Sequence, residues 1–294
     1  MRAPLSTLEV VRPRNLEHAL ALLHESQDGE RLVPLAGGTD LYVSLNAGVV
    51  PGKRFLDLSG LRELRGVRRR DGGLALGALT TFSEIREHPG VRRRYPALAA
   101  AAAEIGAWQI QNRATLGGNI ANASPAGDSL PVLLAFEAVV RARSVRGPRD
   151  VPFTGLFRGY RDLALESDEL ITAVSLPPLG RALHFFRKVG TRRAQSISKV
   201  VFCGLLSLGR DGRVDLVRIA LGSVAPVTLR ARRAEQVLLG ARPSAAAAAA
   251  ARAALLEDIA PIDDIRSDRD YRLLVSGNVL EQFLRTAAPR FVTR

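Results

Sequence analysis

The sequence contains a single cysteine, Cys203. One thiol excludes a disulfide framework, a four-cysteine zinc site and a cysteine-ligated iron–sulfur cluster within this chain. The four histidines show no metal-ligand spacing. We therefore expect neither a metal site nor a catalytic side chain here. Cys203 lies in an apolar run, where free cysteines are usually buried, so we expect it to be a structural thiol.

Lysine is scarce as well: only three of the 42 basic residues are lysines, although the formal net charge is +13. The arginine runs at 68–70 and 92–94 lack interleaved aromatic residues, and we expect them at turns. Charge alone gives only weak, salt-sensitive affinity for nucleic acid. We therefore expect no nucleic-acid partner; a partner with an acidic surface explains the charge equally well. A basic nucleic-acid-binding protein is the alternative.

Long apolar runs are also missing. No stretch approaches the roughly 18 consecutive apolar residues that cross a bilayer, and residues 1–6 lack the apolar core of a signal peptide. We therefore expect a cytoplasmic protein without a transmembrane segment. There is no G-x-G-x-x-G motif, so a Rossmann dinucleotide site is unsupported. With 294 residues, the chain has room for one large or two ordinary domains.

Apolar patterning divides the chain into two parts. In the first, short β-like segments alternate with helical stretches, such as Asn15–Leu23 and a helix that begins with a capping box at Thr81. The Pro-Pro-Leu-Gly segment at 177–180 breaks the pattern and predicts a domain boundary. Beyond it, strands come first and helices follow, which favours an α+β fold. The predicted strands are 32–36, 54–58, 74–79, 138–143, 183–189, 197–208 and 214–221, and the later helices are 229–239, 244–259 and 268–286.

A first candidate site is the Ala-Gly-Gly-Thr-Asp loop at 36–40, between a predicted strand and a helical run that begins at Leu41. Two consecutive glycines let the backbone bring its amides close to a ligand. Thr39 or Asp40 can cap the following helix, whose first amides favour an anion. This is the physics of a pyrophosphate cradle. Alone, the pattern favours a structural turn.

A second candidate is the segment from Thr115 to Asp128, which we expect to be a loop because twelve of its fourteen residues are small or polar. Its amides, hydroxyl groups and Asn side chains suit an extended phosphate-and-ribityl ligand, and Asp128 can accept from a sugar or ring N–H. A long loop without internal charge is usually functional, although an Asx-rich structural loop is the alternative. At Gly117, we expect a branched side chain to cost cofactor occupancy more than fold stability.

Together, the two loops resemble those of the FAD-binding subunit of the xanthine dehydrogenase and carbon monoxide dehydrogenase family. The resemblance implies an α+β chain with two domains. It implies that residues 1–177 form a two-subdomain FAD-binding domain of the vanillyl-alcohol oxidase/p-cresol methylhydroxylase type. It implies that residues 181–294 form a smaller α+β domain of the carbon monoxide dehydrogenase flavoprotein C-terminal type. The further matching segments are 77–81, 168–171, 187–193, 220–222 and 271–272.

The resemblance implies an oxidoreductase subunit that passes electrons from iron–sulfur clusters of a partner through FAD to an external acceptor, NAD or a quinone. It implies a hetero-oligomer with a small [2Fe-2S] subunit and a large molybdopterin subunit. The substrate stays open among purines, carbon monoxide, aldehydes and N-heterocycles. Neither flavin loop contains a histidine, so we expect non-covalent FAD. A stand-alone FAD oxidoreductase of the same fold is the alternative.

The resemblance also implies roles for individual residues. The two loops wrap the pyrophosphate and ribityl chain, Asp128 bonds toward the adenosine or ribityl portion, and Ile105 and Ile171 line the cofactor. Lys188 lies near the flavin ring, although the sequence alone equally suits a solvated strand residue. Gln111 stands where the family often has Arg, so we expect the second loop to be braced differently. The predicted cofactor-binding residues are Leu35, Ala36, Gly37, Gly38, Thr39, Asp40, Leu41, Ile105, Thr115, Gly117, Gly118, Asn119, Asp128, Ile171 and Lys188.

Overall fold

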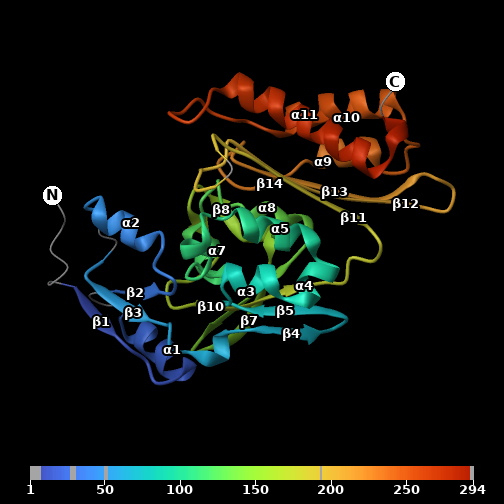
Figure 1. The fold of residues 1–294 in the computed structure, drawn as a ribbon. Coiled ribbons are helices and arrows are strands. Elements are labelled where there is room, and N and C mark those ends of the chain that lie inside the picture. Colours follow the sequence, from blue (N-terminus) through green and yellow to red (C-terminus); the bar gives the residue numbers. More distant parts are fainter. Residues whose placement is uncertain (1–7, 27–30, 50–51, 193, 292–294) are drawn as a thin grey trace.

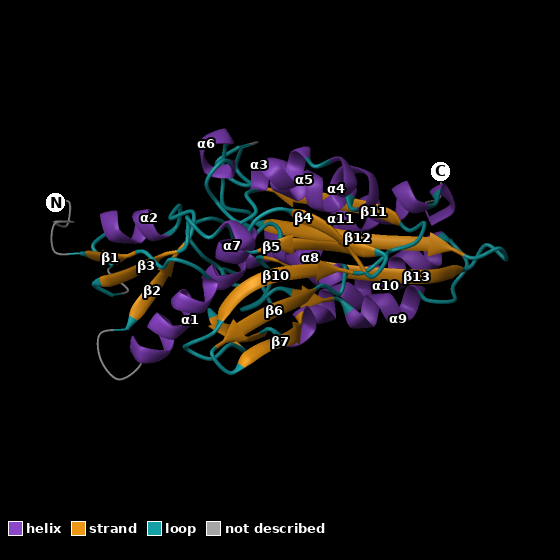
Figure 2. Cartoon of the chain, turned by 90° about the horizontal axis from the view of Figure 1, so that it is seen from below, coloured by secondary structure: helices purple, strands orange, loops and turns teal. Residues whose placement is uncertain are grey.

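The computed structural model describes residues 8–26, 31–49, 52–192 and 194–291. Three regions follow one another along the chain, and each is built on a β-sheet of its own (Figures 1 and 2). Within the described residues, no helix has both the length and the apolar character needed to cross a membrane.

The N-terminal region is a small parallel sheet with two helices. The outer strands β1 and β2 both pair in parallel with β3. The apolar face that the sequence predicts for α1 is buried, and the Asn15 side chain caps this helix by accepting from the amide of His18 at 2.9 Å. The elements of this region are β1 (Glu9–Val11), α1 (Leu16–Glu25), β2 (Leu32–Leu35), α2 (Leu41–Asn46) and β3 (Arg54–Asp57).

The central region is an antiparallel sheet in the order β4-β5-β10-β6-β7, with helices over one face (Figure 1). Its strands are β4 (Val67–Arg70), β5 (Gly73–Gly77), β6 (Val139–Ser144), β7 (Gly147–Pro152) and β10 (Leu170–Leu176). Its helices are α3 (Phe82–Glu87), α4 (Pro89–Arg94), α5 (Pro96–Glu104), α6 (Trp108–Gln111), α7 (Leu116–Asn122) and α8 (Leu130–Ala135). A hairpin of β8 (Phe157–Gly159) and β9 (Asp162–Leu163) and the 3-10 helices Arg62–Leu64 and Phe153–Gly155 complete it. The capping box predicted at Thr81 is confirmed.

The C-terminal region is an antiparallel sheet in the order β11-β12-β13-β14. Helices α9 to α11 cover one face, and α5 and α8 of the central region lie against the other (Figure 1). The elements are β11 (Leu183–Val189), β12 (Val200–Leu208), β13 (Val214–Gly222), β14 (Leu229–Arg230), α9 (Arg232–Leu238), α10 (Ala245–Asp258), α11 (Arg269–Ala287) and the 3-10 helix Pro289–Phe291.

Strand β12 is buried on both faces, which explains its continuous apolar run. Phe202 and Leu206 pack into the core under the C-terminal helices, whereas Cys203 and Leu205 belong to the central core. The prediction that Cys203 is a buried structural thiol is confirmed, and burial raises its pKa. The chain break predicted at 177–180 separates β10 from β11. Because the central core includes residues beyond that break, the division into domains 1–177 and 181–294 stays a prediction.

The α+β fold and all the predicted strands are present, with ends shifted by up to three residues. Two predictions are wrong. The helix expected from Leu229 begins only at Arg232, after β14. The arginine runs do not lie at turns: 68–70 belongs to β4 and 92–94 to α4. Strand β4 is a sheet edge, where charged side chains face solvent, and the last turn of a helix favours cations.

Candidate functional site

The first candidate loop connects β2 to α2, as the sequence predicts. Gly38 has a φ of +74°, a left-handed conformation that glycine adopts without strain. The six backbone amides of residues 36–41 donate no hydrogen bond to any described residue. Consecutive backbone amides without acceptors around a tight turn form an anion-binding surface. This loop therefore offers several donors to a ligand.

Asp40 stands at the N-cap position of α2, but its side chain makes no capping hydrogen bond. The prediction that Thr39 or Asp40 caps this helix is therefore wrong. The pKa of Asp40 is raised because its carboxyl group loses solvent, and the guanidinium of Arg161 opposes this rise. Arg161 also donates to Asn122 Oδ1 at 3.0 Å. It therefore lies between the first loop and the carboxyl end of α7.

The first loop packs directly against the start of the second segment. A Cβ atom added to Gly37 would lie 2.0 Å from the carbonyl oxygen of Arg113, and one added to Gly118 would lie 3.9 Å from the Cβ of Ala36. Only a residue without a side chain allows the backbone at Gly37 to approach so closely. The structure therefore brings together the two segments that lie about eighty residues apart in the sequence.

The second segment is not the continuous loop that we expected, because residues 116–122 form helix α7. The hydroxyl group of Thr115 caps this helix by accepting from the amide of Gly118 at 3.2 Å. The amides of Leu116 and Gly117 donate to the carbonyl groups of Thr80 and Ala78 at 3.0 and 2.8 Å. Helix α7 is therefore anchored on the chain that follows β5, and its first amides are already engaged.

Gly117 faces protein. A Cβ atom there would lie 2.7 Å from the Cβ of Ala78 and 2.9 Å from its carbonyl oxygen. The physical basis of our expectation for a branched side chain at Gly117 is therefore wrong, because the close approach is to Ala78. Gly118 is only partly buried and has fewer close neighbours than Gly117. Asn119 accepts from the Ser129 hydroxyl at 2.7 Å, which ties α7 to the residue after Asp128.

Asp128 and Lys188 form a buried ion pair. The Lys188 ammonium lies 2.6 Å from Asp128 Oδ2 and donates to the Glu104 carbonyl oxygen at 2.8 Å. The side chain of Lys188 is 4% exposed and that of Asp128 is 9% exposed, so a solvated position for Lys188 is ruled out. Burial raises the pKa of Asp128 to about 6, even though the ammonium lowers it. The Ser198 hydroxyl also lowers the pKa of Asp128, but it donates to the Ala126 carbonyl oxygen at 3.2 Å. Asp128 Oδ1 is therefore buried without a hydrogen-bond partner among the described residues and can accept from a ligand.

The two predicted apolar residues lie on the same framework. Ile105 follows Glu104, whose carbonyl group accepts from Lys188, and it is 8% exposed. Ile171 is equally buried in β10, next to Thr172, whose carbonyl oxygen accepts from the amide of Ala78 at 2.9 Å. The predicted residues therefore follow a continuous path from the first loop through α7 to β11.

Gln111 braces this path. Its side-chain amide donates to the carbonyl groups of Ala103 and Ile105 at 3.0 and 3.1 Å and accepts from Arg86 at 2.9 Å. Gln111 thus supports the end of α5, where we expected an effect on the second loop. Sequence reasoning missed Arg86, which also stacks 3.8 Å from the ring centroid of Trp108. No sequence signal links Arg86 to Gln111, because they are 25 positions apart.

Known proteins match this chain over nearly its whole length. The family described as "FAD binding domain in molybdopterin dehydrogenase" matches residues 6–179, and "CO dehydrogenase flavoprotein C-terminal domain" matches residues 185–287. A putative xanthine dehydrogenase FAD-binding subunit of Escherichia coli (strain K12) is 34% identical over 267 residues, covering 89% of each chain. The carbon monoxide dehydrogenase medium chain of Hydrogenophaga pseudoflava is 30% identical and covers 95% of this chain and 96% of its own length.

Solved structures agree. A carbon monoxide dehydrogenase structure from Hydrogenophaga pseudoflava superposes with a TM-score of 0.92 at 30% identity and covers 99% of both chains. Quinoline 2-oxidoreductase from Pseudomonas putida 86 gives a TM-score of 0.90 at 26% identity over the full length of both chains. The similarity therefore includes all three sheets and the path between the two glycine segments.

Proposed function

We propose an electron-transfer role for this chain, which belongs to the family of FAD-binding subunits of molybdenum hydroxylases. As a member of that family, it is an oxidoreductase subunit and binds FAD. In this role it receives electrons from the iron–sulfur clusters of a partner chain and delivers them to an external acceptor, NAD or a quinone. When bound, FAD supplies the capacity to exchange electrons one or two at a time.

The observation that carries the proposal is that two groups of buried or clustered polar atoms, one in the first loop and one at Asp128, lack hydrogen-bond partners within the described residues. The free amides of residues 36–41 fit a pyrophosphate. At the other end of the path, Asp128 Oδ1 is a buried acceptor without a partner. The Lys188 ammonium has three donors, of which two are used within the chain. FAD complements this arrangement, because its central pyrophosphate can meet the free amides while the hydroxyl and ring groups of the ribityl-flavin part meet Asp128 and Lys188.

Each predicted residue can be assigned to one part of the FAD molecule. We assign the pyrophosphate to the first loop, from Leu35 to Leu41, and the adjoining ribityl chain to the second segment, where Gly118 and Asn119 are partly exposed and Thr115 and Gly117 hold the segment in place. Of the ribityl and adenosine hydroxyl groups predicted for Asp128, we assign it a ribityl hydroxyl, because its ion-pair partner Lys188 is assigned to the flavin ring. Ile105 and Ile171 provide apolar contacts, and Lys188 supplies positive charge near the flavin ring. Binding is non-covalent, because neither loop contains a histidine.

The proposal places the remaining chemistry on partner chains. The single cysteine is buried and cannot ligate a [2Fe-2S] cluster alone. Among the described residues, no three His, Cys, Asp or Glu side chains are grouped to hold a metal ion. We therefore propose a small [2Fe-2S] subunit and a large molybdopterin subunit as partners in a hetero-oligomer. Relatives carry the names "FAD-subunit" and "medium chain", which agrees with such an assembly.

The test uses the purified full-length chain. We expect a yellow protein that releases FAD into the supernatant on acid precipitation. Flavin mononucleotide, or flavin retained in the pellet, contradicts the assignment of two non-covalent binding segments. The chain alone is expected to reduce dyes with NADH but not to oxidise xanthine, carbon monoxide, aldehydes or N-heterocycles. Turnover of any of these substrates without partner chains supports the stand-alone oxidoreductase instead.

A further inference from the structure

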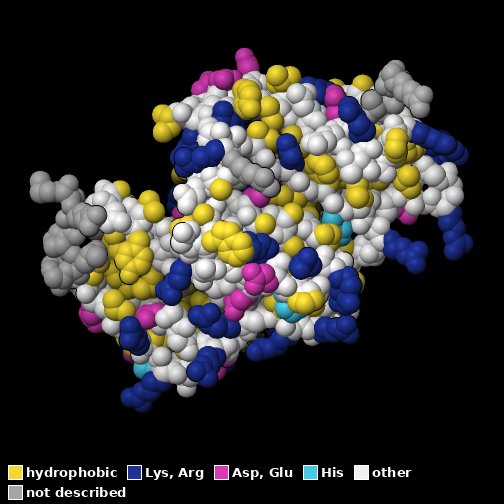
Figure 3. Space-filling model, in the orientation of Figure 1, with side chains coloured by type: hydrophobic (Ala, Val, Ile, Leu, Met, Phe, Trp, Pro, Cys, Tyr) yellow, Lys and Arg dark blue, Asp and Glu magenta, His cyan; other side chains and the backbone are white. Residues whose placement is uncertain are grey.

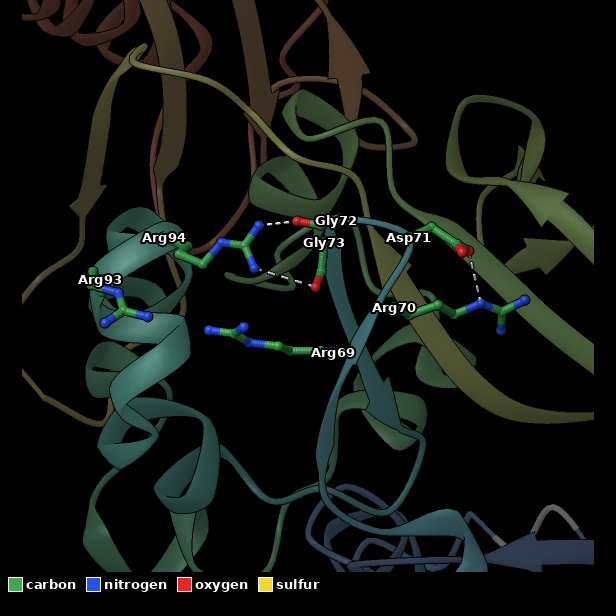
Figure 4. Close-up of a pocket in the computed structure, with 7 residues that line it drawn as sticks. All are labelled: Arg69, Arg70, Asp71, Gly72, Gly73, Arg93 and Arg94. Carbon is green, nitrogen blue, oxygen red and sulfur yellow. Dashed lines mark hydrogen bonds and ion pairs between the residues drawn. The ribbon is translucent and has the colours of Figure 1, made fainter.

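An arginine-lined cleft lies between the β4–β5 turn and the last turn of α4. Its volume is about 650 Å³, and its walls are Arg69, Arg70, Asp71, Gly72, Gly73, Arg93 and Arg94. Figure 4 shows the hairpin on one side and the helix on the other, with the side chain of Arg69 extended from the hairpin toward the helix and that of Arg93 lying along the helix. Figure 3 shows basic side chains gathered over this part of the surface.

The cleft has a fixed frame and free charges. Arg94 donates to the carbonyl oxygens of Gly72 and Gly73 and so holds the hairpin against α4. Arg70 is paired with Asp71 at 3.2 Å. Arg69 and Arg93 are exposed, and neither side chain makes a hydrogen bond or ion pair with a described residue. Two guanidinium groups therefore face the cleft without a counter-charge, and the one carboxylate in its walls is already engaged.

We propose that this cleft is the docking site for an acidic segment of another protein chain. Guanidinium groups bind carboxylates through paired hydrogen bonds, and opposite charge steers the encounter. The outer edge of β4 is unpaired within the sheet, so an extended segment has backbone groups to meet there as well. The net charge of +13 extends the same complementarity over the whole chain.

The walls also define what the cleft does not fit. All seven lining residues are charged or glycine. Small-molecule sites are mostly apolar and hold a ligand body between hydrophobic or aromatic side chains. Single-stranded nucleic acid needs aromatic side chains on which bases stack. Neither feature is present among the lining residues, whereas a carboxylate-bearing peptide needs only the cations and the strand edge.

The cleft is separate from the FAD path. Strand β5 begins at Gly73 in the cleft wall and ends at Gly77, beside the Ala78 carbonyl that anchors α7. Four residues of extended strand span about 13 Å. An acidic segment in the cleft therefore contacts a different part of the chain from the cofactor. A negative result for peptide binding leaves the FAD assignment untouched, and the reverse also holds.

The test measures binding of a fluorescein-labelled peptide of ten glutamates to the FAD-loaded chain by fluorescence anisotropy at low salt. The double variant Arg69→Glu/Arg93→Glu is expected to weaken binding by about tenfold or more. The matched control is Arg210→Glu/Arg242→Glu, which changes the net charge equally at two exposed arginines elsewhere. We expect the control to weaken binding by less than about threefold, because it alters only long-range attraction. Both variants should keep their full FAD content.

Equal weakening by both double variants overturns the proposal, because net charge alone then explains binding. Absence of binding to the unmodified chain overturns it too. Tighter binding of a labelled ten-nucleotide single strand, with the same dependence on Arg69 and Arg93, assigns the cleft to nucleic acid instead. If the glutamate variant does not fold, Arg69→Gln/Arg93→Gln takes its place and is expected to weaken binding by about threefold or more.

Discussion

The two Gly-Gly segments look alike in sequence but meet the protein in opposite ways. The amides of residues 36–41 have no described acceptor, whereas those of Leu116, Gly117, Gly118 and Asn119 all have acceptors at 2.8 to 3.2 Å. Backbone polar groups need partners, so free amides call for a ligand and engaged amides do not. A glycine pair alone therefore does not identify a phosphate site. What identifies it is whether the backbone amides around the pair lack acceptors within the protein.

This difference separates two kinds of effect. Changes in the first loop should weaken FAD binding while leaving the FAD-free fold nearly intact. Changes in the second segment should destabilise the FAD-free fold, because this segment anchors α7 on Ala78 and Thr80 and leads to the buried pair of Asp128 and Lys188.

The largest expected effect is that of Lys188→Met. It leaves the buried Asp128 carboxylate without its cation, and removing one partner of a buried pair costs about 3–5 kcal/mol. We expect this loss in the free energy of unfolding of the FAD-free protein, measured by urea titration at pH 8. Lys53→Met, at an exposed lysine, is the control and should change stability by less than about 0.5 kcal/mol. A loss below about 1 kcal/mol for Lys188→Met contradicts the buried pair.

Gly117→Ala tests whether the second segment is structural. The added methyl group meets Ala78 at 2.7 Å, and overpacking of this kind costs about 1–3 kcal/mol. We expect a lower urea midpoint of the FAD-free protein. Gly155→Ala, where an added Cβ has no neighbour within 4 Å, serves as the control. An unchanged urea midpoint together with lost FAD binding would restore the view that Gly117 faces the cofactor.

A smaller effect concerns pH. The pKa of Asp128 is about 6 in the fold, above its ordinary value of 3.8. Its protonation therefore adds stability that is fully present below about pH 4 and is lost as pH rises through 6. Between pH 5 and pH 7.5, the loss of the proton from this carboxyl group alone should lower the free energy of unfolding by about 1 kcal/mol. We expect Asp128→Asn to abolish this part of the pH dependence when the free energy of unfolding is measured with urea. If the variant and the unmodified protein lose the same free energy between pH 5 and pH 7.5, Asp128 does not have the raised pKa.

Local signals predicted much of the fold. The capping box at Thr81 and the strand Leu183–Val189 are where the sequence places them. The helices expected from Ser244 and Asp268 begin one residue later, with those two residues as N-caps. These features depend on residues within a few positions of one another, so they can be predicted from the sequence without knowledge of tertiary contacts. Edge strands such as β4 were missed, because arginines facing solvent hide the usual apolar alternation.

The site was only partly predictable. The glycine segments could be recognised, and their role as FAD-binding residues stays a prediction. Helix α7 was not foreseen, since its glycines have low helix propensity and its amides depend on the distant Ala78 and Thr80. The burial of Lys188 was equally hidden, because lysines are rarely buried and its partner Asp128 lies 60 positions away.

The smallest effects come from two threonines, one in each segment, and they test the comparison most directly. The hydroxyl group of Thr115 caps α7, so Thr115→Val should lower the stability of the FAD-free protein by about 1 kcal/mol. Thr39 lies beside the free amides and its hydroxyl group makes no hydrogen bond with a described residue. Thr39→Val should therefore change the FAD-free stability by less than about 0.5 kcal/mol.

The same substitution at Thr39 should weaken FAD binding, because it removes a hydrogen-bonding group from the surface that faces the phosphates. A lost hydrogen bond to a charged group is worth about 1.5 kcal/mol or more, which corresponds to a roughly tenfold higher dissociation constant. Fluorescence quenching during FAD titration measures this constant, and urea unfolding of the FAD-free protein measures stability. Because valine matches threonine in shape, each variant changes one hydroxyl group. If Thr39→Val destabilises the FAD-free fold and Thr115→Val only weakens FAD binding, the roles of the two segments are reversed.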